Sequence, residues 1–232
     1  MKKQTEQTKL KIALPKGRLW ESTQELLEKS GIILDNVERR YKPISNHNEI
    51  EFYIVKPRNI PKMVEQGLFD AGIVGIDLVK DEGANVNINL DLKTMPVYLV
   101  VAGVKEKKKD TLVIASEYVG ITKEYFKKKN QKINILKTYG STECFVPEFA
   151  DLIVDHVQTG RSLVQNNLNV FDLIMKSTTH LISQKELSHD KKRILQSFSK
   201  SLEKGLELVD LNYPQFLTEE NIRNNQLEVA KC

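Results

Sequence analysis

The segment 151–162, DLIVDHVQTGRS, constrains the fold more than any other part of the chain. The apolar residues 152–154 predict a buried strand, and Asp155 follows at the carboxyl end of that strand. Thr159 and Gly160 then predict a tight turn into a helix. Ligands of open α/β sheets bind at the carboxyl ends of the strands. The segment therefore predicts an α/β sheet with a candidate ligand site at this edge.

The turn after Asp155 has the chemistry of a phosphate site. Thr159, Gly160 and Ser162 offer backbone N–H groups, hydroxyls and room for close approach at the start of a helix. An acid just before such a turn suits a sugar phosphate, because the carboxylate accepts hydrogen bonds from ribose hydroxyls while the turn holds the 5-phosphate. The alternative is an ordinary strand–turn–helix junction with a Ser or Thr cap.

Apolar runs and helical periodicity alternate along the chain. The predicted strands are 10–14, 51–55, 69–74, 86–92, 97–101, 112–115, 133–136, 152–154 and 168–182. The predicted helices are 19–30, a helix capped by Asn59 that runs through 65, 118–129, one that follows the turn 140–143, and 190–207. This order predicts an α/β protein of two lobes. Lobe I comprises 1–94 plus 179–232, and lobe II comprises 95–178.

Composition excludes several classes of protein. With 40% hydrophobic and 28% charged residues the chain has an ordinary globular composition, and its net charge of +4 is mild. The lysine clusters at 105–109 and 127–129 carry no interleaved aromatic residues, so we expect solvated faces and no nucleic-acid platform. Two cysteines and four scattered histidines predict neither a disulfide framework nor a zinc site. No apolar run has membrane-spanning length and 1–9 lacks a secretion signal, so we expect a cytoplasmic protein.

Four motifs in order identify a family resemblance. They are KIALPKGRL at 11–19, DAGIVGID at 70–77, YGSTE at 139–143 and the segment 151–162. Together they resemble the short form of the ATP phosphoribosyltransferases, the first enzymes of histidine biosynthesis, over residues 9 to 200.

The resemblance implies a fold, a reaction and partners. The fold would be two α/β lobes like a type II periplasmic binding protein. The reaction would join N1 of ATP to C1 of phosphoribosyl pyrophosphate (PRPP) and would require Mg²⁺, which neutralises the pyrophosphate leaving group. The expected assembly is a homodimer within a hetero-oligomer that contains a regulatory subunit resembling histidyl-tRNA synthetase.

Carried onto this sequence, the resemblance places the PRPP site on the segment 151–162. The predicted PRPP ligands are Asp151, Asp155, Thr159, Gly160, Arg161 and Ser162. Asp155 and Glu143 are the predicted catalytic acids. Glu143 has the alternative role of a helix-start acid. Asp151 points to the same face of the strand as Asp155 but lies about 13 Å away, so a role outside the site remains an alternative for it.

The predicted ligands of ATP or pyrophosphate lie in the first half of the chain. Lys16, Gly17 and Arg18 form a basic turn after the first strand, and Asp70 opens the glycine-containing strand that the resemblance places beside the nucleotide. Surface solvation is the alternative for the two basic residues. No residue is predicted as a direct metal ligand.

His156 adjoins Asp155 and is therefore a candidate general base. It is not predicted to act, because N1 of adenine is already nucleophilic and strand alternation turns successive side chains to opposite faces.

The chain departs from the family pattern in three places. Residues 92–97 lack the usual arginine between the lobes, Thr142 replaces a small apolar residue, and 145–148 is bulky. A paralogue with another acceptor base therefore remains an alternative. So does a two-lobed ligand-binding protein without catalysis.

Overall fold

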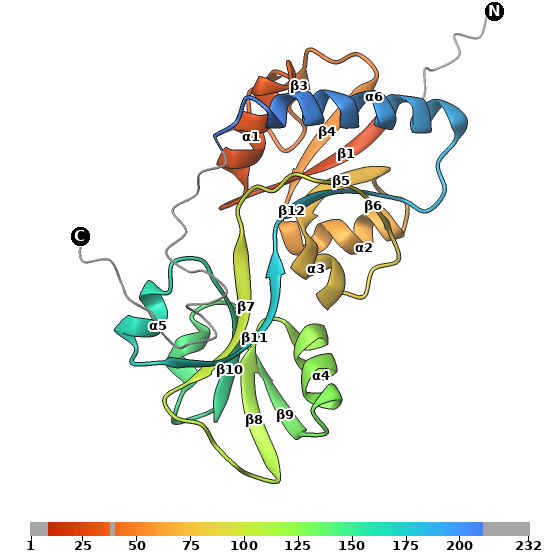
Figure 1. Cartoon of the computed structure of the whole chain (residues 1–232). Helices are drawn as coiled ribbons and strands as arrows, with labels where there is room; N and C mark the ends of the chain where they lie inside the picture. The colour runs from red at the N-terminus through yellow and green to blue at the C-terminus, as the bar shows by residue number, and fades with distance from the viewer. Residues whose placement is uncertain (1–8, 38–39, 211–232) are drawn as a thin grey trace, which may run out of the picture. The chain divides into compact units, whose positions relative to one another are not determined.

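The computed structural model describes residues 9–37 and 40–210 (Figure 1). The chain divides into two compact units. The described part of unit 1 comprises 9–37, 40–95 and 178–210, and that of unit 2 comprises 96–177. The expected place of residues 211–232 in lobe I falls outside the described residues.

Unit 1 is built on a five-stranded sheet in the order β4-β1-β5-β12-β6. Its strands are β1 (Leu10–Pro15), β4 (Ile50–Val55), β5 (Ala71–Gly75), β6 (Asn87–Asp91) and β12 (Thr179–Ser183). Strands β4, β1 and β5 are parallel, whereas β12 runs antiparallel to both β5 and β6. The short strands β2 (Leu34–Asp35) and β3 (Ile44–Ser45) form a separate antiparallel pair.

Helices cover both faces of the unit 1 sheet. They are α1 (Trp20–Lys29), the 3₁₀ turn η1 (Pro57–Asn59), α2 (Ile60–Glu65), α3 (Ile76–Asp81) and α6 (His189–Leu206). Figure 1 shows α1 beside α6 on one side of the sheet and α2 on the other. Ile12 and Leu14 of β1 pack in the α1 and α6 cluster, and Ala13 between them packs with α2. This alternation follows from the two-residue period of a strand.

Gly72 of β5 shows why α2 packs so closely. A Cβ atom built at Gly72 would lie 2.5 Å from Cγ2 of Ile60 and 3.3 Å from Cγ2 of Val64. We therefore expect Gly72→Ala to lower the free energy of unfolding by roughly 1–3 kcal/mol, the usual cost of overpacking. Urea denaturation measures the change. Combined with Ile60→Ala, the loss should be less than the sum of the two single losses, and additive losses would contradict this contact.

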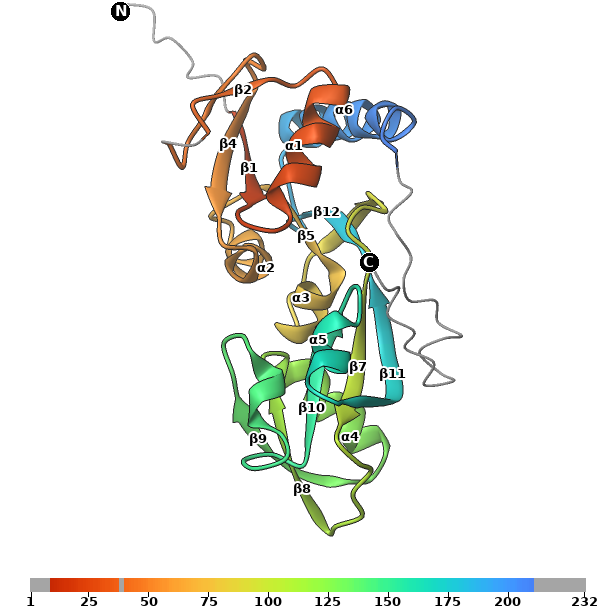
Figure 2. The same cartoon turned by 90° about the vertical axis from the view of Figure 1, so that its left-hand side faces the viewer.

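Unit 2 has a second five-stranded sheet in the order β11-β7-β10-β8-β9. Its strands are β7 (Val97–Gly103), β8 (Thr111–Ser116), β9 (Lys132–Lys137), β10 (Leu152–Val157) and β11 (Asn169–Ser177). Its helical elements are α4 (Val119–Lys128), the 3₁₀ turn η2 (Thr142–Phe145) and α5 (Arg161–Gln165). The strands β10, β8 and β9 are parallel, and β7 is antiparallel to both β10 and β11. Figure 2 shows this unit turned by 90°.

Three predicted elements are wrong in detail. The single strand expected over 168–182 is two strands, β11 and β12, that belong to different sheets and part at Thr178. Asn59 makes no capping bond with its side chain, because the preceding Pro57 starts a 3₁₀ turn that leads into α2. The turn 140–143 leads only into the four-residue 3₁₀ turn η2, since Val146 after it is extended before Pro147.

Candidate functional site

The carboxyl ends of three parallel strands meet at one edge of the unit 2 sheet. Val154 of β10 pairs with Ser116 of β8, and Ser116 pairs with Lys137 at the end of β9. The loops that leave these strands therefore start side by side. In an open α/β sheet this is the edge where ligands bind.

Asp155 lies near the end of β10 and is 9% exposed. Its Oδ1 atom accepts the backbone N–H of His156 at 2.7 Å and lies 3.2 Å from Nδ1 of the same histidine. Its Oδ2 atom has no hydrogen-bond partner among the residues the structure describes. A buried carboxylate normally has partners for its oxygens, so an available oxygen at this edge suits a ligand hydroxyl.

The loop after β10 has the features expected of an anion site. Gly160 has a φ of 73°, a left-handed conformation that favours glycine. The Arg161 N–H donates to the Thr159 hydroxyl at 3.4 Å, and the side chains of Arg161 and Ser162 are exposed. Buried Leu163 anchors the short helix α5 to the core. The predicted residues from Asp155 to Ser162 thus lie at one edge of the sheet.

Glu143 lies at the same edge, on the η2 turn that follows β9. The Thr138 and Thr142 hydroxyls form a buried hydrogen bond of 3.0 Å, which fixes the turn to the end of β9. This bond explains the threonine at 142, because an apolar side chain would leave the Thr138 hydroxyl without it. Glu143 is half-buried on this fixed turn.

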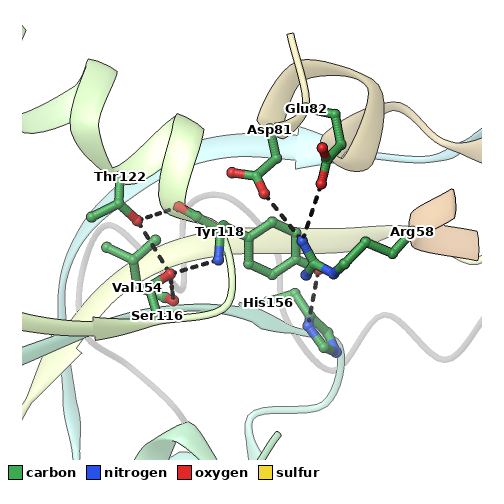
Figure 3. A network of polar contacts seen from close by, with 8 residues as sticks. All are labelled: Arg58, Asp81, Glu82, Ser116, Tyr118, Thr122, Val154 and His156. Carbon is green, nitrogen blue, oxygen red and sulfur yellow. Dashed lines mark hydrogen bonds and ion pairs between the residues drawn. The ribbon is translucent and has the colours of Figure 1, made fainter. Parts of the chain in front are cut away.

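A polar network adjoins Asp155, and the sequence predicted no role for its members (Figure 3). The Tyr118 hydroxyl lies 3.3 Å from Nδ1 of His156, and the two rings meet edge to face. The Ser116 hydroxyl donates to the Val154 carbonyl at 2.7 Å and accepts the Tyr118 N–H at 2.9 Å. The sequence signal was the polar run that follows the apolar residues 112–115, at the end of a predicted strand.

The structure does not bring Asp151 to this edge. It lies just before β10, at the opposite end of that strand from the loop. Its carboxylate accepts the Val113 N–H at 3.0 Å and contacts the Lys109 and Lys107 Nζ atoms at 2.6 and 3.2 Å. Burial raises the pKa of Asp151, but the bonds from Lys109, Val113 and Lys107 outweigh burial and lower the pKa to about 2. The charged carboxylate of Asp151 therefore anchors the lysine-rich segment 105–109.

The basic turn of unit 1 lies at the carboxyl end of β1, next to the end of β4. The Lys16 N–H donates to the Val55 carbonyl at 2.8 Å, and Gly17 has a left-handed φ of 85°. The Trp20 N–H donates back to the Gly17 carbonyl at 2.8 Å, which closes the turn into α1. Arg18 is exposed on this turn.

A pocket of about 380 Å³ opens beside this turn in unit 1. Its lining residues are Lys16, Gly17, Trp20, Glu21, Val37, Arg40, Tyr41 and Ile54. The Lys16 Nζ atom lies 3.3 Å from the Tyr41 hydroxyl and 4.8 Å from the centre of its ring. The pocket thus combines cations with aromatic faces. Sequence reasoning missed Arg40 and Tyr41, although a basic residue beside a tyrosine in a segment without periodicity was the available signal.

Asp70 does not lie with the basic turn. It precedes β5, where its carboxylate accepts the Lys11 N–H at 2.8 Å and pairs with the Lys191 Nζ atom of α6 at 2.8 Å. Lys11 and Lys16 lie at opposite ends of β1. Asp70 therefore connects α6 to the amino end of the unit 1 sheet.

Arg58 also forms bonds inside unit 1. Its guanidinium pairs with Asp81 at 3.1 Å and with Glu82 at 3.9 Å (Figure 3).

Within the described ranges, no three His, Cys, Asp or Glu side chains form a group that could hold a metal ion. None of the described helices is long and apolar enough to cross a membrane.

Comparison with known proteins identifies the family. The family model for ATP phosphoribosyltransferase matches residues 56–204. The chain is 39% identical to an ATP phosphoribosyltransferase of Hydrogenobaculum sp. over 76% of this chain and 90% of that one. It is 38% identical to that of Aquifex aeolicus over 76% of this chain and 86% of the relative.

Solved structures agree on the fold. An ATP phosphoribosyl transferase (HisG:HisZ) complex from Thermotoga maritima superposes with a TM-score of 0.77 at 29% identity, over 86% of this chain and 100% of that one. A periplasmic binding protein from Silicibacter pomeroyi superposes with a TM-score of 0.58 at 13% identity, over 97% and 100%. The predicted two-lobed α/β fold, like that of a periplasmic binding protein, is thereby confirmed. With 33–39% identity to its curated relatives over most of its length, the chain belongs to the ATP phosphoribosyltransferase family.

Proposed function

We propose that this chain transfers the phosphoribosyl group of PRPP to N1 of ATP and releases pyrophosphate, the first step of histidine biosynthesis. Beside family membership, the observation that carries the proposal is Asp155. This acid is 9% exposed, and its Oδ2 atom has no partner among the described residues. It precedes the Thr159-Gly160 turn by four residues.

In this proposal Asp155 and the loop after it bind the ribose phosphate. The Oδ2 atom of Asp155 accepts from ribose hydroxyls, as charge-assisted hydrogen bonds favour. The 5-phosphate binds to the loop N–H groups, the Thr159 and Ser162 hydroxyls and the Arg161 guanidinium. Helix α5 has only five residues, so these donors contribute more than its dipole does.

The chemistry requires positioning and charge rather than a covalent intermediate. The bond between ribose C1 and the pyrophosphate oxygen breaks, and the leaving oxygen keeps the electron pair. The lone pair of adenine N1 forms the new bond to C1. Positive charge develops on the sugar between these events, and the carboxylates of Asp155 and Glu143 stabilise it electrostatically.

The oxygen donors of this edge fit a hard cation such as Mg²⁺. Asp155 and Glu143 would hold the ion together with oxygens of the substrate, since no protein cage of three acids exists among the described residues. When bound, Mg²⁺ neutralises negative charge on the pyrophosphate leaving group.

The basic turn of unit 1 is our candidate for the phosphates of ATP or pyrophosphate. Lys16, Gly17 and Arg18 follow the end of β1, and Arg40 adds a cation to the adjoining pocket. We do not include Asp70 or Asp151 in either ligand set, because the carboxylates of both are bonded to lysines at the amino ends of their strands.

The Thermotoga maritima relative was solved as a HisG:HisZ complex. We propose that this chain likewise works as a homodimer within a hetero-oligomer that contains a regulatory subunit resembling histidyl-tRNA synthetase. We further propose that the complex acts in the cytoplasm on PRPP and ATP.

A direct assay tests the reaction. Purified chain with PRPP, ATP and Mg²⁺ should produce the ultraviolet absorbance of the N1 adduct together with an equal amount of pyrophosphate. The assay is run with and without the regulatory subunit. Other nucleotides replace ATP in parallel reactions, so that a different acceptor base is detected.

Calorimetry distinguishes the remaining outcomes. PRPP should bind the chain and amino acids should not. No product in either assay, together with binding of an amino acid and none of PRPP, would show a binding protein without catalysis. Pyrophosphate release with another acceptor, and none with ATP, would show a phosphoribosyltransferase of different specificity.

A further inference from the structure

The Nδ1 atom of His156 has two oxygen neighbours in unit 2. It lies 3.2 Å from Oδ1 of Asp155. It also lies 3.3 Å from the Tyr118 hydroxyl (Figure 3). The His156 backbone N–H also donates to the same Oδ1 at 2.7 Å. His156 thus contacts one oxygen of Asp155, the residue proposed to bind the ribose, through both its main chain and its ring.

The proton on the ring follows from these neighbours. An ionised carboxylate only accepts hydrogen bonds. An Nδ1 atom that carries the hydrogen is attracted to Oδ1 at 3.2 Å, whereas an unprotonated Nδ1 would turn its lone pair toward the carboxylate. The Nε2–H tautomer would let Nδ1 accept the Tyr118 O–H instead, so the two neighbours favour different tautomers. We infer the Nδ1–H tautomer, because the carboxylate is the stronger acceptor and lies at the shorter distance.

Tyr118 is held firmly on the other side of the ring. It is 5% exposed, and its N–H donates to the Ser116 hydroxyl. The Thr122 hydroxyl donates to its carbonyl at 2.5 Å and lies 3.2 Å from the Ser116 hydroxyl. Burial and these main-chain bonds hold Tyr118 in place, and its phenol contacts the His156 ring. The ring in turn limits the rotation of the Asp155 side chain.

We propose that His156 is a positioning residue for Asp155. It occupies Oδ1, so that Oδ2 remains the oxygen available to the ligand, and it holds the carboxylate in one rotamer before substrate binds. This role rests on the proposed function, in which Asp155 binds the ribose of PRPP. His156 itself transfers no proton in the reaction.

Kinetics of ring variants test the role. His156→Leu removes the ring donor and should raise KM for PRPP roughly tenfold, the effect of one charge-assisted hydrogen bond, with KM for ATP unchanged. His156→Asn keeps an N–H donor near the position of Nδ1 and should recover most of the affinity. Tyr118→Phe removes only the phenolic oxygen and should raise KM less than His156→Leu does.

Matched controls separate this role from general damage. Tyr125→Phe also removes a hydroxyl that bonds to an acid of unit 2, in this case Asp172, and should leave KM for PRPP unchanged. His189→Leu replaces an exposed histidine of unit 1 and should have no effect. An equal rise of both Michaelis constants in His156→Leu, without recovery in His156→Asn, would overturn the positioning role.

A double variant tests whether His156 acts through Asp155. In the Asp155→Asn background, His156→Leu should cause little further change in KM for PRPP, because the carboxylate that it positions is gone. Full additivity of the two changes would overturn the proposal.

Nitrogen chemical shifts of ¹⁵N-labelled histidine provide a readout besides activity. The wild type should show the Nδ1–H form at His156, and Asp155→Asn should weaken that preference. An Nε2–H form that is insensitive to Asp155 would overturn the assignment. If the wild type fails to bind PRPP, the proposed function fails and the positioning role fails with it. Unchanged PRPP affinity in His156→Leu would overturn the positioning role alone.

Discussion

Asp155→Asn is expected to raise KM for PRPP or to lower kcat by roughly one to two powers of ten. The substitution removes the negative charge but keeps the size of the side chain, and its amide oxygen still accepts the His156 N–H. Losing one charge-assisted contact costs roughly 1.5–3 kcal/mol, which corresponds to that change in rate. Initial-rate kinetics with varied PRPP at saturating ATP measure the effect.

The control for this variant is Asp110→Asn, which removes an exposed carboxylate from the same unit and should leave all kinetic constants unchanged. Circular dichroism and the midpoint of urea unfolding should match the wild type for both variants. Wild-type kinetics in a well-folded Asp155→Asn enzyme would remove Asp155 from the site, and the ribose would have to bind elsewhere.

Asp151→Ala should have a large effect of the opposite kind, on stability and not on catalysis. It leaves the Val113 N–H without its acceptor and two lysines without their partner, so we expect the free energy of unfolding to fall by roughly 2–4 kcal/mol. Urea denaturation at neutral pH measures the loss. At temperatures where the variant stays folded, KM for PRPP should equal the wild-type value.

The same carboxylate predicts a pH dependence. The folded-state pKa of Asp151 is about 2 against an ordinary value of 3.8. Because the folded pKa is depressed, its contribution to stability is complete above about pH 5 and is lost progressively as the pH falls through 2. The loss amounts to roughly 2 kcal/mol at most, and it should be absent in Asp151→Ala.

Normal stability together with weak PRPP binding in Asp151→Ala would instead make Asp151 a ligand.

The sequence predicted the fold well where the signals were local. Apolar runs ended by Pro15, Gly67 or polar residues correspond to strands and helices whose ends shift by a few residues. The strand over 168–182 was wrong because no breaker residue separates its halves. Thr178 lies where the chain leaves one sheet for the other, and only pairing between distant strands reveals that change.

The candidate site was predictable in part for the same reason. Asp155 lies near the carboxyl end of β10 and Glu143 follows β9, so the rule of carboxyl ends located them. Asp70 and Asp151 precede strands, and their lysine partners lie far away in sequence or in an irregular segment. His156 was set aside because alternation turns its side chain away from Asp155. The Asp155 carboxylate instead accepts the backbone N–H of His156, which places Oδ1 3.2 Å from Nδ1 of the His156 ring.

The chain passes from unit 1 into unit 2 after residue 95 and returns to unit 1 at residue 178. This connectivity fixes the order in which the two sheets are synthesised. The described part of unit 2 is one uninterrupted stretch, 96–177, whereas the unit 1 sheet lacks β12 until residue 183 has been synthesised. Among the described strands β6 pairs only with β12, so it has no paired neighbour until more than ninety further residues have been synthesised. The inserted unit can thus complete its core while the surrounding one still exposes unpaired strand edges, where chaperones bind.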